Sequence, residues 1–218
     1  MKTSSLATLA AVMAAASMTV STAARAQDAK AGSTKVAMCI GCHNIPGYQS
    51  SFPEIYKVPK IAGQNAKYII ASLNAYKKGE RKHPSMRGIA TTLSDQDMAD
   101  VAAWYEQLGK AAPAPATVGE PPADIAKLLA KANCESCHGK NFSTPIDPSY
   151  PKLAGQHADY LYVALKAYQT DHNPRVGRSN AIMMGMARPF THAEIKDLAK
   201  YLSSLPGELK TVELHEFR

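Results

Sequence analysis

Cysteine and long apolar runs are both scarce in this chain, which has only four cysteines among 218 residues. One uncharged run stands out, at residues 6–20, and it is too short and too rich in alanine to span a membrane comfortably. No segment of alternating strand character lies beside the cysteines, and no acid, base and nucleophile are grouped as in a typical enzyme. These absences argue against a membrane-embedded bundle and against a catalytic protein.

The N-terminus differs in composition from the rest of the chain. Lys2 precedes the apolar run and Ala24-Arg25-Ala26 follows it, in the small-x-small pattern of a cleavage site. We interpret residues 1–26 as a secretory signal peptide and expect the mature chain to begin at Gln27. An uncleaved N-terminal anchor is the alternative interpretation.

All four cysteines lie in two stretches with one pattern, Cys39-Ile40-Gly41-Cys42-His43 and Cys134-Glu135-Ser136-Cys137-His138. Two thiols three positions apart, followed at once by histidine, are typical of a c-type haem attachment site. Both thiols share one side of a helical turn and can reach two vinyl groups on one porphyrin edge, while the histidine offers Nε2 to the iron. The sequence predicts two haem c groups, attached through Cys39, Cys42, Cys134 and Cys137, with irons bound by His43 and His138.

Three other uses of the thiols are less consistent with this pattern. A four-cysteine zinc site usually places its two pairs closer together and needs no histidine after each. A thioredoxin-like redox site occurs once, near alternating strands and helices. Export to an oxidising compartment would allow plain disulfides, but these leave both histidines unexplained.

Much more than the cysteine motif is repeated along the chain. Residues 59–68 match residues 151–160, and each copy precedes a helical stripe of apolar side chains. A second stripe closes each half, after Ser94 with Asp97 in the first and Thr191 with Glu194 in the second, which we predict to be capping boxes. The first pair of stripes is Ile69, Leu73, Tyr76 and Leu161, Leu165, Tyr168; the second pair is Val101, Trp104, Leu108 and Leu198, Tyr201, Leu205.

A proline-rich stretch separates the two repeats and favours an extended linker. We therefore predict an all-α protein of two tandem helical domains of similar design, each with one covalently bound haem. The predicted domains are residues 27–110 and 121–212, joined by a linker at 111–120 and followed by a tail at 213–218.

The sixth ligand of each iron decides between electron transfer and chemistry on a bound substrate. A gap-free alignment of the closing helices places Met86 over Met183, each in a Met-x-Gly sequence. A thioether favours reduced iron, so we predict Met86 on the first haem iron and Met183 on the second. Met184, Met186 and His83 have no matched ligand in the other half, and we expect local or solvent-facing roles for His157, His172, His192 and His215.

Three further features bear on the haems and their partners. Each predicted proximal histidine needs an acceptor for Nδ1–H, and the carbonyls of Pro59 and Pro151 are the candidates. The basic residues 77–83 are either a solvated face or a docking patch for an acidic redox partner. The longer segment between residues 43 and 59 carries Tyr48, Phe52 and Tyr56, which we expect at an interdomain contact or a partner surface.

The two CxxCH motifs, the repeated Pro-Lys-(Ile/Leu)-Ala-Gly-Gln segment and the Met-x-Gly before each final helix resemble the cytochrome c4 family, the di-haem class I c-type cytochromes of bacterial periplasms. The resemblance implies two tandem cytochrome c-like domains with the cytochrome c fold. It also implies outer-sphere electron transfer from a quinol-oxidising complex to a terminal oxidase. It further implies redox proteins as partners and peripheral contact with the membrane surface. The basic stretch at residues 77–83 has no interleaved aromatic residues and no nucleic-acid motif, so we expect no nucleic-acid partner.

Two alternative hypotheses remain open. The chain could be the electron-accepting subunit of a periplasmic dehydrogenase such as a sulfide- or thiosulfate-oxidising enzyme, because both roles need the same haems. A di-haem peroxidase would need an open iron site, against which Met86 and Met183 argue.

Overall fold

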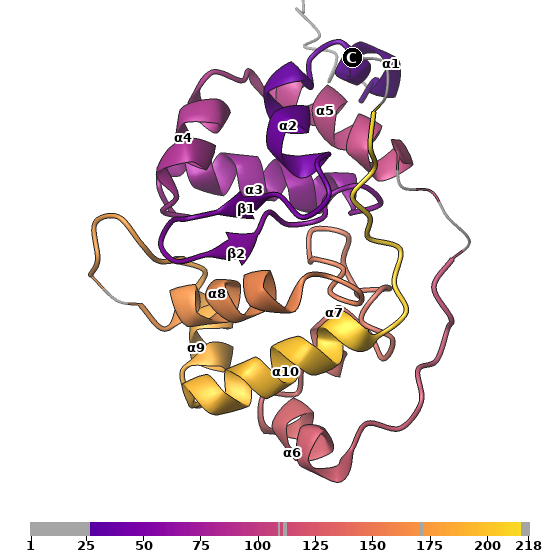
Figure 1. Ribbon diagram of the computed structural model, residues 1–218, viewed down its shortest axis with the longest axis vertical. Coiled ribbons are helices and arrows are strands. Elements are labelled where there is room, and N and C mark those ends of the chain that lie inside the picture. The colour runs from indigo at the N-terminus through magenta and orange to yellow at the C-terminus, as the bar shows by residue number, and fades with distance from the viewer. Residues whose placement is uncertain (1–26, 109, 111–112, 171, 215–218) are drawn as a thin grey trace, which may run out of the picture.

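The two halves of the repeat form two helical domains, one above the other in Figure 1. The computed structural model describes residues 27–108, 110, 113–170 and 172–214, so the predicted signal peptide lies outside the described residues. The first domain contains α1 (Ala29–Ser33), α2 (Ala37–His43), β1 (Gln49–Ser50), β2 (Tyr56–Lys57), α3 (Ala66–Lys78), α4 (Pro84–Thr91) and α5 (Asp95–Leu108). The second contains α6 (Ala123–Lys131), α7 (Glu135–His138), α8 (Ala158–Tyr168), α9 (Ala181–Ala187) and α10 (His192–Ser204). The described residues form mostly helix and confirm the predicted all-α class.

Each domain has its own apolar core, built by the stripes that the sequence predicts. In the first domain Ile69 of α3 and Val101 of α5 are buried in one cluster with Tyr105. In the second, Leu161 of α8 and Leu198 of α10 are buried in another cluster, around Phe142. The periodic burial of one helical face therefore holds each domain together separately.

Both closing helices begin at the predicted capping boxes. Asp97 N–H donates to Ser94 Oγ, and Ser94 N–H donates to Asp97 Oδ2, each at 3.1 Å. Thr191 and Glu194 make the same reciprocal pair, at 3.2 and 2.7 Å. Each cap satisfies two otherwise unpaired amides and fixes where the last helix starts.

The first and last helices of the first domain cross at a glycine. A Cβ added to Gly32 of α1 would lie 2.1 Å from the carbonyl oxygen of Asp100 and 2.9 Å from Trp104 Cβ, both on α5. Only a residue without a side chain permits this approach. In the second domain α6 packs on α10, where Lys131 pairs with Glu194 at 2.9 Å.

The longer segment of the first domain forms a short hairpin of β1 and β2 that contacts α8 of the second. Lys57 N–H donates to Asp159 Oδ2 at 3.0 Å, and Glu54 forms an ion pair with Lys166. Tyr56 is buried with its ring 6.1 Å from that of Tyr160. Of the two expected roles, these contacts favour the interdomain one.

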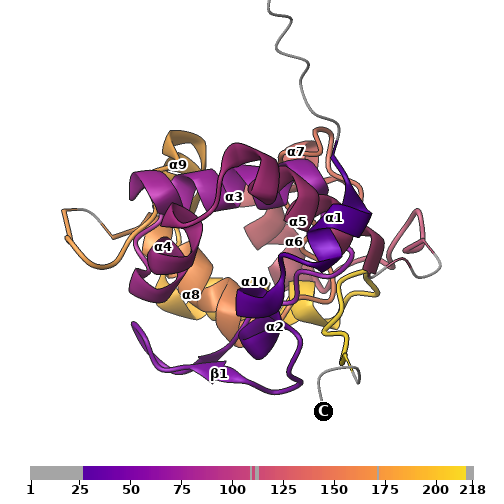
Figure 2. The same ribbon diagram turned by 90° about the horizontal axis from the view of Figure 1, so that it is seen from above.

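Two connecting segments run along the outside of the domains. The linker lies on one side and the loop between α8 and α9 on the opposite side, in both views (Figures 1 and 2). After α10 the chain leaves the second domain and runs back along the first toward α1 (Figure 1). In the described part of the chain, every helix is too short or too polar to cross a membrane.

Candidate haem sites

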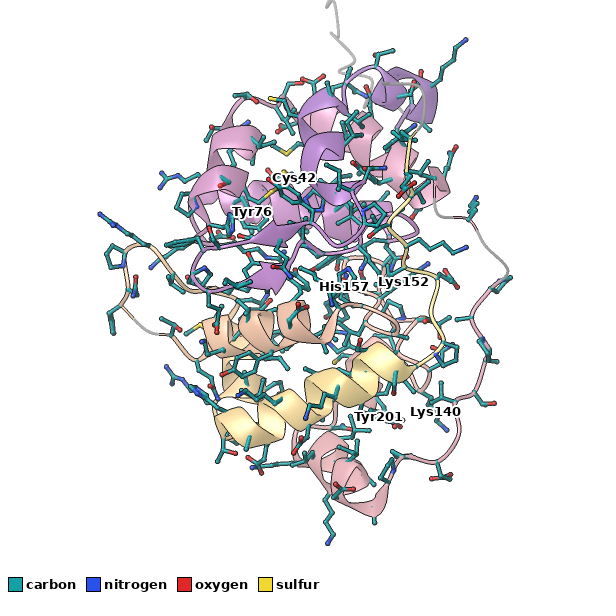
Figure 3. All side chains as sticks on the ribbon, viewed as in Figure 1. Cys42, Tyr76, Lys140, Lys152, His157 and Tyr201 are labelled. Carbon is teal, nitrogen blue, oxygen red and sulfur yellow. The ribbon has the colours of Figure 1, made fainter. Side chains whose placement is uncertain are left out.

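The first cysteine motif lies on one short helix. Cys39, Cys42 and His43 all belong to α2, so both half-buried thiols stand about one helical turn apart. Cys39 packs against the first core, and burial raises the pKa of its thiol to about 11. Cys42 lies in the upper domain of Figure 3, in the same part of the molecule as Tyr76 of α3.

The second cysteine motif repeats this arrangement at the start of α7. Cys134 is the N-cap residue with helical backbone angles, and Cys137 and His138 lie in the helix. Cys134 packs against the second core, and burial raises the pKa of its thiol. All four cysteines are unpaired, so the disulfide alternative finds no support.

Both predicted proximal histidines are held by the predicted proline carbonyls. His43 Nδ1–H donates to the Pro59 oxygen at 2.9 Å, and His138 Nδ1–H donates to the Pro151 oxygen at 3.2 Å. Burial lowers the pKa of both imidazoles, only partly offset by these hydrogen bonds, so both favour the neutral form. Because Nδ1 is occupied, Nε2 is the nitrogen available to a metal.

The two methionines occupy the same position of two matched helices. Met86 N–H in α4 donates to Nδ1 of the N-cap residue His83 at 3.3 Å. Met183 N–H in α9 donates to Oδ1 of the N-cap residue Asn180 at 3.0 Å. His83, which the sequence leaves as a possible ligand, thus has the capping role that Asn180 has in the other half.

The other candidate ligands lie elsewhere. Met186 is 43% exposed and His172 is exposed in the loop before α9. The ring of His192 stands 6.1 Å from that of Tyr162, and His157 is the N-cap residue of α8. Met184 is half-buried in α9, and His215 lies outside the described residues. Among the described residues, no three His, Cys, Asp or Glu side chains are grouped to hold a metal ion.

A cluster of arginine and tyrosine between the domains was not predicted from the sequence. Arg81 donates to Tyr68 Oη at 3.0 Å, and Arg178 donates to Tyr160 Oη at 3.1 Å. The backbones of the two arginines pair as an antiparallel bridge. Burial acts to raise the pKa of Tyr68, but Arg81 and Arg178 outweigh it and hold that pKa at about 8. Tyr68 corresponds to Tyr160 in the repeat, and Arg81 corresponds to Arg178. This correspondence was the sequence signal that could have indicated the cluster.

Part of the basic stretch at residues 77–83 makes contacts within the protein. Arg81 belongs to the interdomain cluster, and Lys82 Nζ donates to the Asn173 carbonyl of the second domain at 2.6 Å. Lys77 Nζ donates to the Leu93 carbonyl at 2.7 Å. These three cations therefore have partners inside the protein, whereas Lys78 in the same stretch is exposed and stays a candidate for contact with a redox partner.

The comparisons with known proteins agree with this geometry. The family model for cytochrome c matches residues 29–109 and 123–206. Cytochrome c4 of Stutzerimonas stutzeri is 34% identical over 194 residues, covering 83% of this chain and 90% of that protein. The chain belongs to the cytochrome c4 family. The structure of reduced recombinant cytochrome c4 from Pseudomonas stutzeri matches with a TM-score of 0.60 and 30% identity, over 83% of this chain and 100% of that one.

The similar proteins also include electron acceptors of thiosulfate dehydrogenase. A thiosulfate dehydrogenase electron acceptor of Stutzerimonas stutzeri (strain A1501) is 31% identical over 193 residues, covering 83% of this chain and 84% of that protein. Both names describe proteins that transfer electrons. With two cytochrome c domains and two CxxCH motifs, this member of the cytochrome c4 family takes two haem c groups and functions in electron transfer.

Proposed function

We propose that the chain is an exported electron carrier in which a histidine and a methionine of each domain would bind one haem iron. In the first domain, residues 27–110, Cys39 and Cys42 hold the haem while His43 and Met86 bind its iron. The second domain, whose last helix is α10, uses the matched set Cys134, Cys137, His138 and Met183, while the segment after α10 packs on the first domain.

One observation carries this proposal, the repetition of a single geometry in both halves. Each half has a histidine that favours the neutral form and whose Nδ1 is already bound, and a methionine near the start of an N-capped helix. Two thiols, an imidazole and a thioether form a donor set that suits a covalently attached haem. Such a haem, when bound, exchanges one electron; the residues around it fix the two ligands and limit the access of water.

The interdomain arginines fit a further need of the haems. Arg81 and Arg178 are largely enclosed by tyrosines, whose influence keeps the pKa of both guanidinium groups high despite burial. No carboxylate among the described residues pairs with either one. Buried cations are normally paired with an anion. We propose that haem propionates supply that negative charge.

The carrier would take electrons from a quinol-oxidising complex and pass them to a terminal oxidase in the periplasm. The family assignment and the predicted signal peptide support this. The second candidate function is the electron-accepting subunit of a dehydrogenase, which the similarity to a thiosulfate dehydrogenase electron acceptor favours. Purification from the native periplasm and membranes separates the two: a stoichiometric enzyme subunit favours the second, and a free cytochrome that a terminal oxidase oxidises favours the first.

Absorption spectroscopy of the haem-loaded protein tests the ligand set. We expect the methionine-to-iron charge-transfer band from both haems, and half of it to disappear in Met86→Leu or Met183→Leu. Met186→Leu changes an exposed methionine on the same helix as Met183 and should leave the band intact. Loss of the band in that control, or ready carbon monoxide binding by the untreated reduced protein, would contradict the assignment.

A further inference from the structure

Each proximal histidine is connected to the other domain through a single peptide group. The carbonyl oxygen of Pro59 accepts the hydrogen bond from His43 Nδ1–H at 2.9 Å. The N–H of the same peptide belongs to Lys60 and donates to Oε1 of Gln156, in the second domain, at 3.0 Å. The side chain of Gln156 therefore lies two hydrogen bonds from the imidazole of the first domain.

The second domain repeats this connection in the opposite direction. His138 Nδ1–H donates to the Pro151 carbonyl at 3.2 Å, and Lys152 N–H of that peptide donates to Oε1 of Gln64, in the first domain, at 2.9 Å. Figure 3 shows Lys152 near the boundary between the domains. Each glutamine therefore binds the peptide group that holds the histidine of the other domain.

Hydrogen bonds hold both glutamines in one orientation. Gln64 and Gln156 expose only 3% and 4% of their surface. Gln64 Nε2–H donates to the Lys152 carbonyl at 3.1 Å, and Gln156 Nε2–H to the Lys60 carbonyl at 2.9 Å. Each Oε1 also accepts from the next residue of its own chain segment at 3.0 Å. Both amides are therefore fixed with oxygen toward the peptide N–H.

This geometry has an electronic consequence for the histidine. An acceptor at the N–H side of a peptide polarises it and increases the negative charge on its carbonyl oxygen. A more negative oxygen strengthens the hydrogen bond from Nδ1–H and makes Nε2 a stronger donor. A stronger donor favours ferric iron and so lowers the reduction potential.

We propose that Gln64 and Gln156 are positioning residues that act across the domain interface, each lowering the reduction potential of the haem in the other domain. Gln156 acts on the first haem through Pro59 and His43, and Gln64 acts on the second through Pro151 and His138. The proposal rests on the proposed function, because it requires both histidines to be iron ligands. It goes further by making the interface a determinant of both potentials.

The test is a redox titration of haem-loaded protein with Gln156→Met and Gln64→Met. Methionine keeps most of the side-chain volume and removes the hydrogen bonds. We expect Gln156→Met to raise the potential of the first haem only, and Gln64→Met to raise that of the second haem only. Met86→His, which changes the first iron's own ligand, identifies which step belongs to the first haem.

A matched control is Gln169→Met. Gln169 Nε2–H donates to the Ala187 and Phe190 carbonyls at 2.8 and 2.7 Å, entirely within the second domain. Its replacement should leave the first haem's potential unchanged. A Gln156→Met variant that shifts only the second haem, shifts both equally or shifts neither would overturn the proposal.

Two further measurements separate this electronic role from a purely structural one. In the paramagnetic NMR spectrum of the oxidised protein, the ring protons of His43 should move in Gln156→Met and those of His138 should stay. Gln156→Glu keeps the acceptor and should leave the first potential at or below that of the parent; a rise would overturn the proposal even if Gln156→Met failed to mature. A parent protein without two His/Met haems would instead refute the proposed function.

Discussion

The side chain of Asn44 joins the residue after His43 to the far end of the chain, because its Nδ2–H donates to the Val212 carbonyl at 2.7 Å. Asn44 Oδ1 in turn accepts from Tyr105 Oη–H at 2.8 Å, inside the first core. Val212 also packs against that core. The segment that leaves the second domain after α10 therefore completes the surroundings of the first cysteine motif.

A chain that ends at Leu209 should lose this support. It removes the acceptor of Asn44 and also the backbone bond from Lys210 N–H to the Ala62 carbonyl. We expect the first domain to lose about 1–3 kcal/mol of unfolding free energy, the usual cost of leaving a buried polar group unpaired. Fluorescence of Trp104, the single tryptophan, measures unfolding of this domain in guanidinium chloride.

The control for this truncation is Asn141→Ala in the second domain. Asn141 Nδ2–H donates to the Pro115 carbonyl at 2.9 Å, so it holds the linker rather than the C-terminal segment. The Trp104 transition should stay in place in this variant. A transition that moves equally in both proteins would mean that the truncation acts on the whole molecule instead of the first domain.

Gly32→Ala should destabilise the first domain by about 1–3 kcal/mol or more, as overpacking of a close contact does. The added Cβ would meet the Asp100 oxygen at 2.1 Å, and backbone cannot move aside without separating α1 from α5. Gly119→Ala is the matched change, since its Cβ would meet nothing within 4 Å. Thermal unfolding of both variants, followed by circular dichroism, gives the comparison. Equal stability of the two variants would refute the close contact between α1 and α5 at Gly32.

Much of the fold could be predicted because it depends on local patterns. The capping boxes, the apolar stripes and the two proline acceptors follow from residue type and spacing alone. The interdomain contacts could not be predicted in this way. Arg81 and Lys82 look like exposed cations in the sequence, and only the approach of the second domain turns them into interface residues. Likewise, no local pattern indicates that Val212 returns to Asn44.

Asp100 should make the stability of the first domain depend on pH. The pKa of the Asp100 carboxyl group is lowered, and the largest cause is the hydrogen bond from Lys35 at 2.7 Å. Burial acts in the opposite direction, and the hydrogen bond from Asp28 N–H at 3.0 Å lowers the pKa further. A carboxyl group with a lowered folded pKa stabilises the fold above its unfolded pKa of about 3.9, and this contribution is lost as pH falls through the folded value.

Asp100→Asn should therefore be less stable than the parent at pH 7, and the difference should shrink below about pH 4. Denaturant titrations at pH 7, 4 and 3, followed by Trp104 fluorescence, measure this difference in unfolding free energy. Asp197→Asn changes a 54% exposed carboxylate in the second domain and should leave the Trp104 transition unchanged throughout. A difference for Asp100→Asn that stays constant with pH would show that packing, and not charge, is responsible.

Neutralising two cations of one basic stretch should distinguish an interface from a docking surface. Arg81→Gln removes the hydrogen bond to Tyr68 and the cation–π contacts with Tyr68 and Tyr76. We expect it to lower the unfolding free energy by about 1–3 kcal/mol. Lys78→Gln removes the same charge from an exposed side chain and should change stability by less than about 0.5 kcal/mol. If both variants instead kept full stability and slowed electron transfer to an acidic partner alike at low salt, the stretch would act through its charge and the interdomain role of Arg81 would be refuted.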